Sequence, residues 1–329
     1  MIISKTPHRI SFFGGGTDYP AYYLKHGGKA LGVAIDKYSY INVRKLPPFF
    51  DHKHRIVYSR QENVNDVSEI VHPSVRETLR YLSIDYGVSI HHDGDIPARS
   101  GMGSSSAFTV GLLNSFYALE GKMISKESLR DGAIYIEQQL IQENVGSQDQ
   151  TFAAYGGLNL VEFLQSGHIS VKPLILDADR LAEFEGSLML FFTGVSRTAH
   201  EIAGEQISKS EINEPNLHIM KGLVDEALGI LTSNTDLDEF GKLLNETWRL
   251  KKTLSTKISS DDIDLMYGAA IKAGALGGKL LGAGGGGFML FFVRSERQES
   301  VKKALEGYLH IPFKFDFDGS KIVVYEPKH

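Results

Sequence analysis

The sequence predicts an α+β protein built from two domains. Its 329 residues exceed the usual length of a single domain core. The first half mixes strand-like stretches with helical ones, whereas apolar residues at helical spacing dominate the second half. We therefore expect a first domain at residues 1–186 and a second domain at residues 187–329.

In the first half, small or alternating apolar side chains predict strands, and a longer apolar period predicts a helix. Residues 29–43 and 55–59 have strand character, whereas residues 75–86 have helical character. Residues 158–163 and 169–176 are a further pair of strand-like stretches, joined by a turn-rich piece that suits a hairpin.

In the second half, an apolar strand at residues 188–192 precedes several amphipathic helices. Apolar side chains recur four residues apart at positions 223–231 and again at positions 263–271. The chain then returns to strand-like stretches at residues 314–318 and 321–326.

Composition excludes several classes of function. Hydrophobic residues make up 42% and charged residues 23%, as in ordinary globular enzymes. The net charge of −5 argues against nucleic-acid and anionic membrane partners. The absence of cysteine rules out disulfides, thiolate metal sites and cysteine nucleophiles, and it fits a reducing compartment. With no long apolar segment and no secretory segment at residues 1–11, we expect a cytoplasmic protein.

Glycine is concentrated in three clusters, at residues 14–16, 101–103 and 282–287. Glycine permits positive φ angles and close backbone approach, so any one cluster could be a simple turn. The middle cluster lies within residues 97–107, between a strand-like stretch and a helical pattern. A glycine loop at a helix start presents free N–H groups and the positive end of the helix dipole. This arrangement predicts a phosphate cradle, although its serines could also cap the helix or bind magnesium.

Familiar nucleotide signatures do not fit these clusters. A Walker loop requires Ser or Thr after its lysine, but Lys279 is followed by Leu280. The dinucleotide-binding fingerprint and the loop motifs of protein kinases are absent as well. Phosphate binding must therefore use another architecture.

Residues 7–18, 97–107 and 279–288 resemble, in this order, the three motifs of the GHMP kinases. This superfamily includes galactokinase, homoserine kinase, mevalonate kinase and phosphomevalonate kinase, and the resemblance spans nearly the whole chain. Within it, the chain is most similar to D-glycero-D-manno-heptose 7-phosphate kinases. The similarity lies in the first motif, in residues 146–150, in Thr193-Gly194 with Arg197, and in Trp248 with Lys251. The resemblance implies the two-domain GHMP kinase fold, with ATP and Mg²⁺ entering a cleft between the domains.

The same resemblance implies a catalytic pair. Phosphoryl transfer needs an acceptor hydroxyl in line with the phosphate, and charges that stabilise the moving group. Asp149 matches the acid assigned as base in similar kinases, and Arg9 matches the cation that stabilises nearby charge. Ser105 and Glu137 match the magnesium ligands, with Glu143 as a rival to Glu137. Whether Asp149 takes the proton early or late stays open.

Further residues are implied to bind the two substrates. A sugar phosphate requires a cationic pocket, because a doubly charged group is costly to bury unpaired. Arg197, Lys251 and Lys279 could form that pocket, although lone Lys and Arg residues more often lie on solvated faces. The expected ATP-binding residues are Pro97, Arg99, Ser100, Gly101, Met102, Gly103, Ser104, Ser105 and Ser106, and the expected sugar-binding residues are Gly16, Thr17, Asp18, Arg197, Lys251, Lys279, Gly284 and Gly285.

The function implied is an ATP-dependent kinase that phosphorylates the anomeric hydroxyl of D-glycero-D-manno-heptose 7-phosphate. Its 1,7-bisphosphate product would lead towards nucleotide-activated heptose for surface polysaccharide. One alternative is an anomeric kinase of an unphosphorylated sugar, similar to galactokinase or fucokinase. Another is a catalytically silent sensor of ATP and sugar, against which the retained catalytic and metal residues argue. The sequence leaves open the anomer, the nucleotide base and the oligomeric state, a homodimer included.

Overall fold

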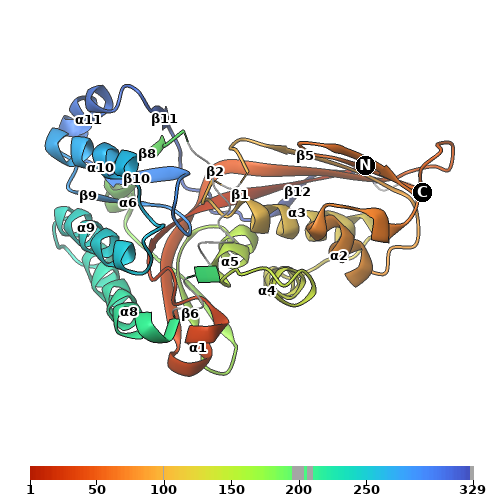
Figure 1. Cartoon of the computed structure of the whole chain (residues 1–329), viewed down its shortest axis with the longest axis horizontal. Helices are drawn as coiled ribbons and strands as arrows, with labels where there is room; N and C mark the ends of the chain where they lie inside the picture. Colours follow the sequence, from red (N-terminus) through yellow and green to blue (C-terminus); the bar gives the residue numbers. More distant parts are fainter. Residues whose placement is uncertain (99, 195–203, 206–209, 327–329) are drawn as a thin grey trace.

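The computed structural model describes residues 1–98, 100–194, 204–205 and 210–326. Figure 1 shows an elongated molecule in which a long sheet with helices beneath it occupies one end, and a smaller sheet with further helices occupies the other. The first and last described residues meet at the far end of the long sheet, where the amino group of Met1 donates to the carbonyl of Glu326 at 2.7 Å.

The larger sheet has eight strands, and most of its pairings are antiparallel. Its central strand, β2, pairs with β1 along most of its length. The first part of β2 also pairs with β6, and its last part pairs with β5. The strands are β1 (Ile2–Phe13), β2 (Gly28–Lys45), β3 (His54–Val57), β4 (Gln61–Val64), β5 (Val88–Gly94), β6 (Leu158–Phe163), β7 (Ile169–Pro173) and β12 (Lys321–Tyr325).

Helix α3 (Ser104–Leu119) lies between this sheet and two other helices. One of its faces packs Phe108, Leu112 and Phe116 against the sheet, and the opposite face packs against α4 (Lys126–Tyr135) and α5 (Gln148–Tyr155). This double burial explains why the helix is apolar on nearly all sides. Its first turn is consequently fixed in position at one end of the sheet.

Two short helices complete the covering of this sheet. Helix α2 (Pro73–Tyr81) confirms the helical pattern at residues 75–86 but begins earlier and ends sooner. Helix α2 ends because Ser83 adopts the left-handed conformation, with a φ of 53°. The N–H of Ile84 then donates to the carbonyl of Leu79. Helix α1 (Pro20–His26) lies between β1 and β2 in the sequence.

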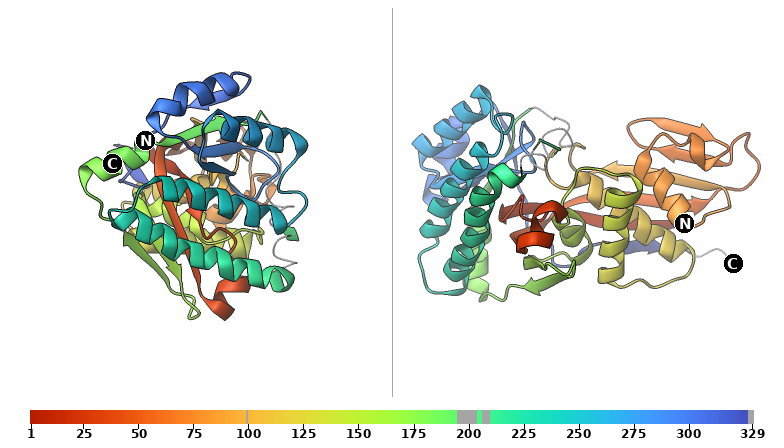
Figure 2. Two further views of the ribbon diagram at one scale, coloured as in Figure 1. Left: turned by 90° about the vertical axis from the view of Figure 1, so that its left-hand side faces the viewer. Right: turned by 60° about the horizontal axis from the view of Figure 1, so that its bottom comes forward.

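The smaller sheet has the strand order β11-β8-β10-β9 and is antiparallel throughout. Its strands are β8 (Leu188–Phe192), β9 (Gly277–Leu280), β10 (Phe288–Phe292) and β11 (Leu309–Ile311). Around it lie α6 (Ala178–Gly186), α8 (Ser210–Thr232), α9 (Asp238–Thr253), α10 (Asp261–Ala273) and α11 (Gln298–Ala304). Figure 2 shows these helices gathered at one end of the molecule.

The predicted strands at 188–192 and 158–163 are confirmed with their limits, and the hairpin between β6 and β7 is confirmed as well. The strand predicted at residues 314–318 is wrong, because only Phe315 forms a single bridge, to Ile35. Backbone bonds to β2 join the N–H of Asp36 to the carbonyl of Lys314 and the N–H of Asp316 to the carbonyl of Ala34, and side-chain carboxylates accept from the neighbouring N–H groups. Asp36 accepts from the N–H of Lys314, and Glu185 accepts from the N–H of Phe315.

A cluster of aromatic rings joins the two halves of the molecule. Phe12 and Phe13 at the end of β1 meet Phe184 of α6 and Phe240 of α9 edge-on, with ring centroids 4.8–5.5 Å apart. These rings belong to one continuous hydrophobic core that also contains residues of both sheets. The division at residue 186 stays a prediction, since β8 opens the second sheet but β12 returns to the first.

Among the described residues, no helix combines the length and the apolar character that crossing a membrane requires.

Candidate functional site

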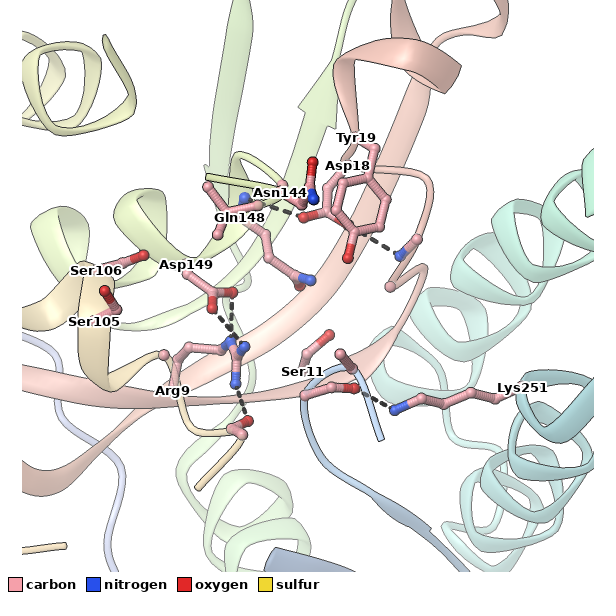
Figure 3. A pocket seen from close by; sticks show the side chains of 18 of the residues that line it. Arg9, Ser11, Asp18, Tyr19, Ser105, Ser106, Asn144, Gln148, Asp149 and Lys251 are labelled. Atoms are coloured by element: carbon pink, nitrogen blue, oxygen red, sulfur yellow. Dashed lines mark hydrogen bonds and ion pairs between the residues drawn. The ribbon is translucent and has the colours of Figure 1, made fainter. Parts of the chain in front are cut away.

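A cavity of about 280 Å³ lies where the two halves meet. Its walls come from β1, from the loop after β1, from the start of α3, from the segment before α5, and from α8, α9 and the end of β9 (Figure 3). Segments far apart in the sequence therefore converge on one space. Residues from all three glycine clusters and Asp149 line it.

The glycine loop before α3 forms one wall. Gly101 and Gly103 have φ angles of 78° and 74°, which residues with a side chain rarely adopt. Between them the side chain of Met102 is fully buried and anchors the loop. The N-cap of α3 is Gly103, which has no side chain to occupy the first N–H groups of the helix. The positive end of a sixteen-residue helix therefore faces the cavity and favours an anion.

Arg9 and Asp149 form a bidentate ion pair at the cavity wall. Nε of Arg9 donates to Oδ1 of Asp149 at 2.8 Å, and Nη2 donates to Oδ2 at 2.7 Å. The third guanidinium nitrogen, Nη1, donates to the carbonyl of Gly101 at 2.8 Å. The side chain of Arg9 is 5% exposed and that of Asp149 is 26% exposed, so the carboxylate is the more accessible partner. Two charge-assisted hydrogen bonds fix its orientation.

Asp18 lies across the cavity from this pair (Figure 3). Its carboxylate accepts from the N–H of Gly16 at 3.0 Å and from the N–H of Gln148 at 3.4 Å. Burial, together with the charge of Asp149, raises the pKa of Asp18 to about 6. Only glycine can occupy position 146, because a Cβ there would lie 1.8 Å from the Asp18 carboxylate.

Two buried lysines line the opposite side of the cavity. Lys251 of α9 donates to the carbonyl of Leu280 at 2.8 Å, and Lys279 of β9 donates to the carbonyl of Phe12 at 2.8 Å. Burial, and then the charge of Arg9, lowers the pKa of Lys279 to about 7. Burial and repulsion from Lys279 lower the pKa of Lys251 well below its usual value. These ammonium groups contact carbonyls, so an anionic ligand would relieve the unfavourable burial of their charge.

Glu137 is fully buried behind the cavity wall, on the π-helical turn at Ile136–Leu140. Its Oε2 accepts from the hydroxyl of Ser106 at 2.8 Å and from the amide of Gln150, whereas its Oε1 has no hydrogen-bond partner. Burial raises the pKa of Glu137 to about 7. An orphaned carboxylate oxygen fits a nearby cation, but Ser105 and Glu143, not Glu137, line the cavity itself.

The structure brings many of the expected site residues together and separates others. Those that line the cavity are Arg9, Gly16, Asp18, Gly101, Gly103, Ser104, Ser105, Ser106, Asp149, Lys251 and Lys279. Those of the described chain that do not are Pro97, Ser100, Met102, Thr17, Glu137, Gly284 and Gly285. Arg99 and Arg197 lie outside the described residues.

The residues away from the cavity have other contacts. The hydroxyl of Thr17 donates to the carbonyls of Gly14 and Lys29, which holds the turn after β1. Gly284 and Gly285 pack against Ile258, whose carbonyl accepts from the N–H of Gly285 at 2.9 Å. These three residues support the loops on which the cavity is built.

Several lining residues were missed by the sequence analysis. Tyr19 directly follows the first motif, and Gln148 lies within residues 146–150, but neither was assigned a role. Met220 and Leu254 also line the cavity. No sequence signal could have distinguished them, because both are apolar residues in helical patterns that otherwise indicate core.

Comparisons with known proteins find one family of kinases. The family model for the N-terminal domain of GHMP kinases matches residues 69–157, and the model for the C-terminal domain matches residues 226–310. D-glycero-alpha-D-manno-heptose 7-phosphate kinase of Campylobacter jejuni is 30% identical over 97% of this chain and 98% of its own. Mevalonate kinase of Pyrococcus abyssi is 25% identical over 91% of this chain and 90% of its own.

Solved structures are similar over almost the whole chain. A D-glycero-D-manno-heptose 1-phosphate kinase from Bacteroides thetaiotaomicron superimposes with a TM-score of 0.81 at 26% identity, covering 99% of this chain and 100% of its own. A putative sugar kinase from Campylobacter jejuni superimposes with a TM-score of 0.72 at 27% identity, covering 98% and 97%. The fold is therefore shared with sugar kinases.

The substitution Gly101→Ala tests the close approach at the glycine loop. A Cβ at this position would lie 2.6 Å from the carbonyl oxygen of Leu281, in addition to the strain of the positive φ. Gly121→Ala is the matched control, since Gly121 has a similar φ of 67° with no atom within 4 Å. We expect the control to lose about 1–2 kcal/mol of unfolding free energy, and Gly101→Ala to lose clearly more, in urea titrations. Equal losses would contradict the close approach.

Proposed function

The chain belongs to the GHMP kinases, and from this premise we propose that it transfers the terminal phosphoryl group of ATP to the anomeric hydroxyl of D-glycero-D-manno-heptose 7-phosphate. Sugar kinases are its relatives over nearly its full length. The observation that carries the proposal is the placement of the Arg9–Asp149 pair between the helix start that favours an anion and the two buried lysines.

The phosphates of ATP bind at the first turn of α3 in this proposal. Backbone N–H groups there, and the dipole of the helix, hold phosphate oxygens without many cationic side chains. The loop at Gly101 to Gly103 allows the phosphates to approach the backbone closely. Because Arg9 bonds both to the carbonyl of Gly101 and to Asp149, the phosphate loop and the proposed base are held at a fixed separation.

Asp149 accepts the proton of the acceptor hydroxyl. As the oxygen of that hydroxyl forms its bond to the terminal phosphorus, the bond between this phosphorus and the bridging oxygen of ATP breaks, and ADP leaves. Arg9 holds both carboxylate oxygens of Asp149 and supplies positive charge beside the transferred group. Asp18, held by two backbone N–H groups, binds and orients sugar hydroxyls.

Ser105 at the cavity wall would hold Mg²⁺ together with Glu137, which lies behind the wall, or with Glu143, which lines the cavity. When bound, this ion neutralises charge on the phosphates of ATP. The orphaned oxygen of Glu137 and the hydroxyl of Ser106 beside it supply the oxygen-rich surroundings that such a hard cation prefers.

The use of ATP as the phosphoryl donor favours a cytoplasmic location for the protein.

Lys251 and Lys279 bind the phosphate already present on the sugar. Both are buried and line the cavity, and both have a lowered pKa that a phosphate dianion would restore. A neutral sugar offers these amines no negative charge, whereas a phosphate dianion stabilises their ammonium form, which favours the phosphorylated acceptor over galactose or fucose. The 1,7-bisphosphate product would supply the synthesis of nucleotide-activated heptose for surface polysaccharide.

A panel of acceptors tests the proposal. Purified protein with ATP and Mg²⁺ is assayed for ADP release with D-glycero-D-manno-heptose 7-phosphate, the corresponding 1-phosphate, free heptose, galactose and L-fucose. We expect the 7-phosphate to give the highest kcat/KM, and phosphorus NMR to identify the 1,7-bisphosphate. Faster turnover of a free sugar would establish the unphosphorylated alternative, and no sugar-dependent ADP release at all would favour a sensor.

The substitution Asp149→Asn should lower kcat by about 10²–10⁴-fold, because the amide cannot accept the proton. Affinity for ATP should stay nearly unchanged, since the phosphates contact the start of α3. Asp85→Asn, at an exposed position, is the control and should keep full turnover. Undiminished turnover in Asp149→Asn would remove this residue from the mechanism.

Binding of the sugar phosphate near pH 8 should take up protons. At this pH Lys279 is mostly neutral in the free protein, because its pKa is lowered to about 7. A phosphate dianion beside it favours the ammonium form and raises that pKa, so a proton enters from solvent. Calorimetry in buffers of different ionisation enthalpy measures the uptake, which Lys279→Met should reduce and the exposed control Lys272→Met should not. The same uptake in Lys279→Met would place the phosphate elsewhere.

A further inference from the structure

A cluster of side chains that could hold a metal ion lies outside the cavity, on α1 and the first half of α8. Figures 1 and 2 show these two helices side by side. It contains His26, the last residue of α1, and Glu214 and His218, which are one turn apart on α8. Each of the three offers a ligand atom, and all these atoms lie within 4.8 Å of one another. The chain thus brings together residues that are nearly 190 positions apart in the sequence.

The distances suit a small tetrahedral ion. Nε2 of His26 lies 3.3 Å from Oε2 of Glu214. Two ligand atoms at bond lengths of roughly 2.0–2.1 Å from a tetrahedral zinc ion are themselves about 3.3–3.4 Å apart. The remaining separation, up to 4.8 Å, closes with small side-chain rotations, since His26 and Glu214 are only partly buried and His218 is exposed.

The hydrogen bonding of His218 prepares it as a ligand. Its Nδ1 lies 2.7 Å from the carbonyl of Glu214, which can only accept, so Nδ1 carries the proton. The lone pair of Nε2 is therefore available, and a backbone carbonyl on the other ring nitrogen is the usual support of a metal-bound imidazole.

Tyr22 and Lys221 lie next to the cluster, and their hydrogen bonding decides whether Glu214 is available to a cation. Tyr22 is 2% exposed, packs against both imidazole rings, and has a hydroxyl with no hydrogen-bond partner. The ammonium group of Lys221 donates to the carbonyls of His26 and Gly27, so its charge is directed at the end of α1 and not at the Glu214 carboxylate. The carboxylate therefore remains available to a cation, and a water on that cation could satisfy the buried hydroxyl of Tyr22.

We propose that His26, Glu214 and His218 bind one divalent transition ion of the zinc class, separate from the Mg²⁺ of the kinase reaction. Two imidazoles and one carboxylate are ligands that Zn²⁺ and similar ions prefer, whereas Mg²⁺ and Ca²⁺ prefer oxygen ligands throughout. Three protein ligands leave a fourth position for water.

Such an ion would cross-link α1 and α8 close to the cavity, because its ligands come from both helices. Helix α1 follows directly after Asp18 and Tyr19 of the cavity wall and is about 10 Å long. The loop before α1 already packs on α8, since a Cβ at Gly16 would lie 3.0 Å from Leu217. Met220 of α8 lines the cavity as well. The ion would therefore stabilise one wall of the sugar pocket.

The test is zinc binding to the full chain after removal of metals with a chelator. With excess Mg²⁺ present, calorimetry with ZnCl₂ should give one equivalent per chain, and Zn²⁺ should raise the melting temperature. Co²⁺ in place of Zn²⁺ should give the intense visible absorption of a four-coordinate ion. Neither readout depends on kinase activity, so failure here is distinguishable from failure of the proposed function.

Variants assign the site. His26→Ala, His218→Ala and Glu214→Gln should each weaken zinc binding by more than the roughly 10–100-fold typical of residues outside the first coordination sphere. His168→Ala, in the exposed turn after β6, is the matched control and should bind zinc normally. Circular dichroism checks that each variant is folded. The absence of stoichiometric zinc binding, or zinc binding that persists in the double variant His26→Ala/His218→Ala, would overturn the proposal.

Discussion

The guanidinium of Arg9 connects three segments on which the cavity depends. Its Nε and Nη2 hold the carboxylate of Asp149, its Nη1 holds the carbonyl of Gly101, and its backbone N–H bonds to the carbonyl of Met102 at 3.2 Å. Arg9 itself lies on β1, a strand that pairs along its length with β2 and is covered by α3. The position of the proposed base relative to the phosphate loop is therefore set by a strand that is paired with β2 along its length.

The cavity contains buried ionisable groups that have no partner of opposite charge in the described part of the folded protein. Arg9 is matched by Asp149, but Lys251 and Lys279 are buried against carbonyl groups, and Asp18 is buried with a raised pKa. Each of these groups costs folding free energy, because burial disfavours its charged form. The same imbalance favours ligands that bring a phosphate to the lysines and hydroxyl donors to Asp18. Buried groups of this kind are typical of binding sites, where the needs of ligand binding conflict with the stability of the fold.

How far the sequence predicts this structure depends on the range of the interactions involved. The strands at 188–192 and 158–163 follow from patterns within a few residues, and their limits were predicted well. The stretch at 314–318 has the same local character, yet Asp36 and Glu185 accept from the N–H groups of Lys314 and Phe315, and the segment forms only a single bridge to β2. Local pattern describes what a segment can form, and distant partners decide whether it does so.

The sequence by itself determined the α+β class and the three glycine motifs, because these depend on local periodicity and backbone freedom. It indicated Arg9 and Asp149 as a pair through the resemblance to GHMP kinases, and their hydrogen bonds are seen in the structure. Only the tertiary structure decided that Lys251 and Lys279 face one space, and that Glu137 lies behind the wall of the cavity. It alone brought α1 against α8. The physical reason is that burial and side-chain contact arise when the two halves pack around a shared aromatic core, which no short stretch of sequence records.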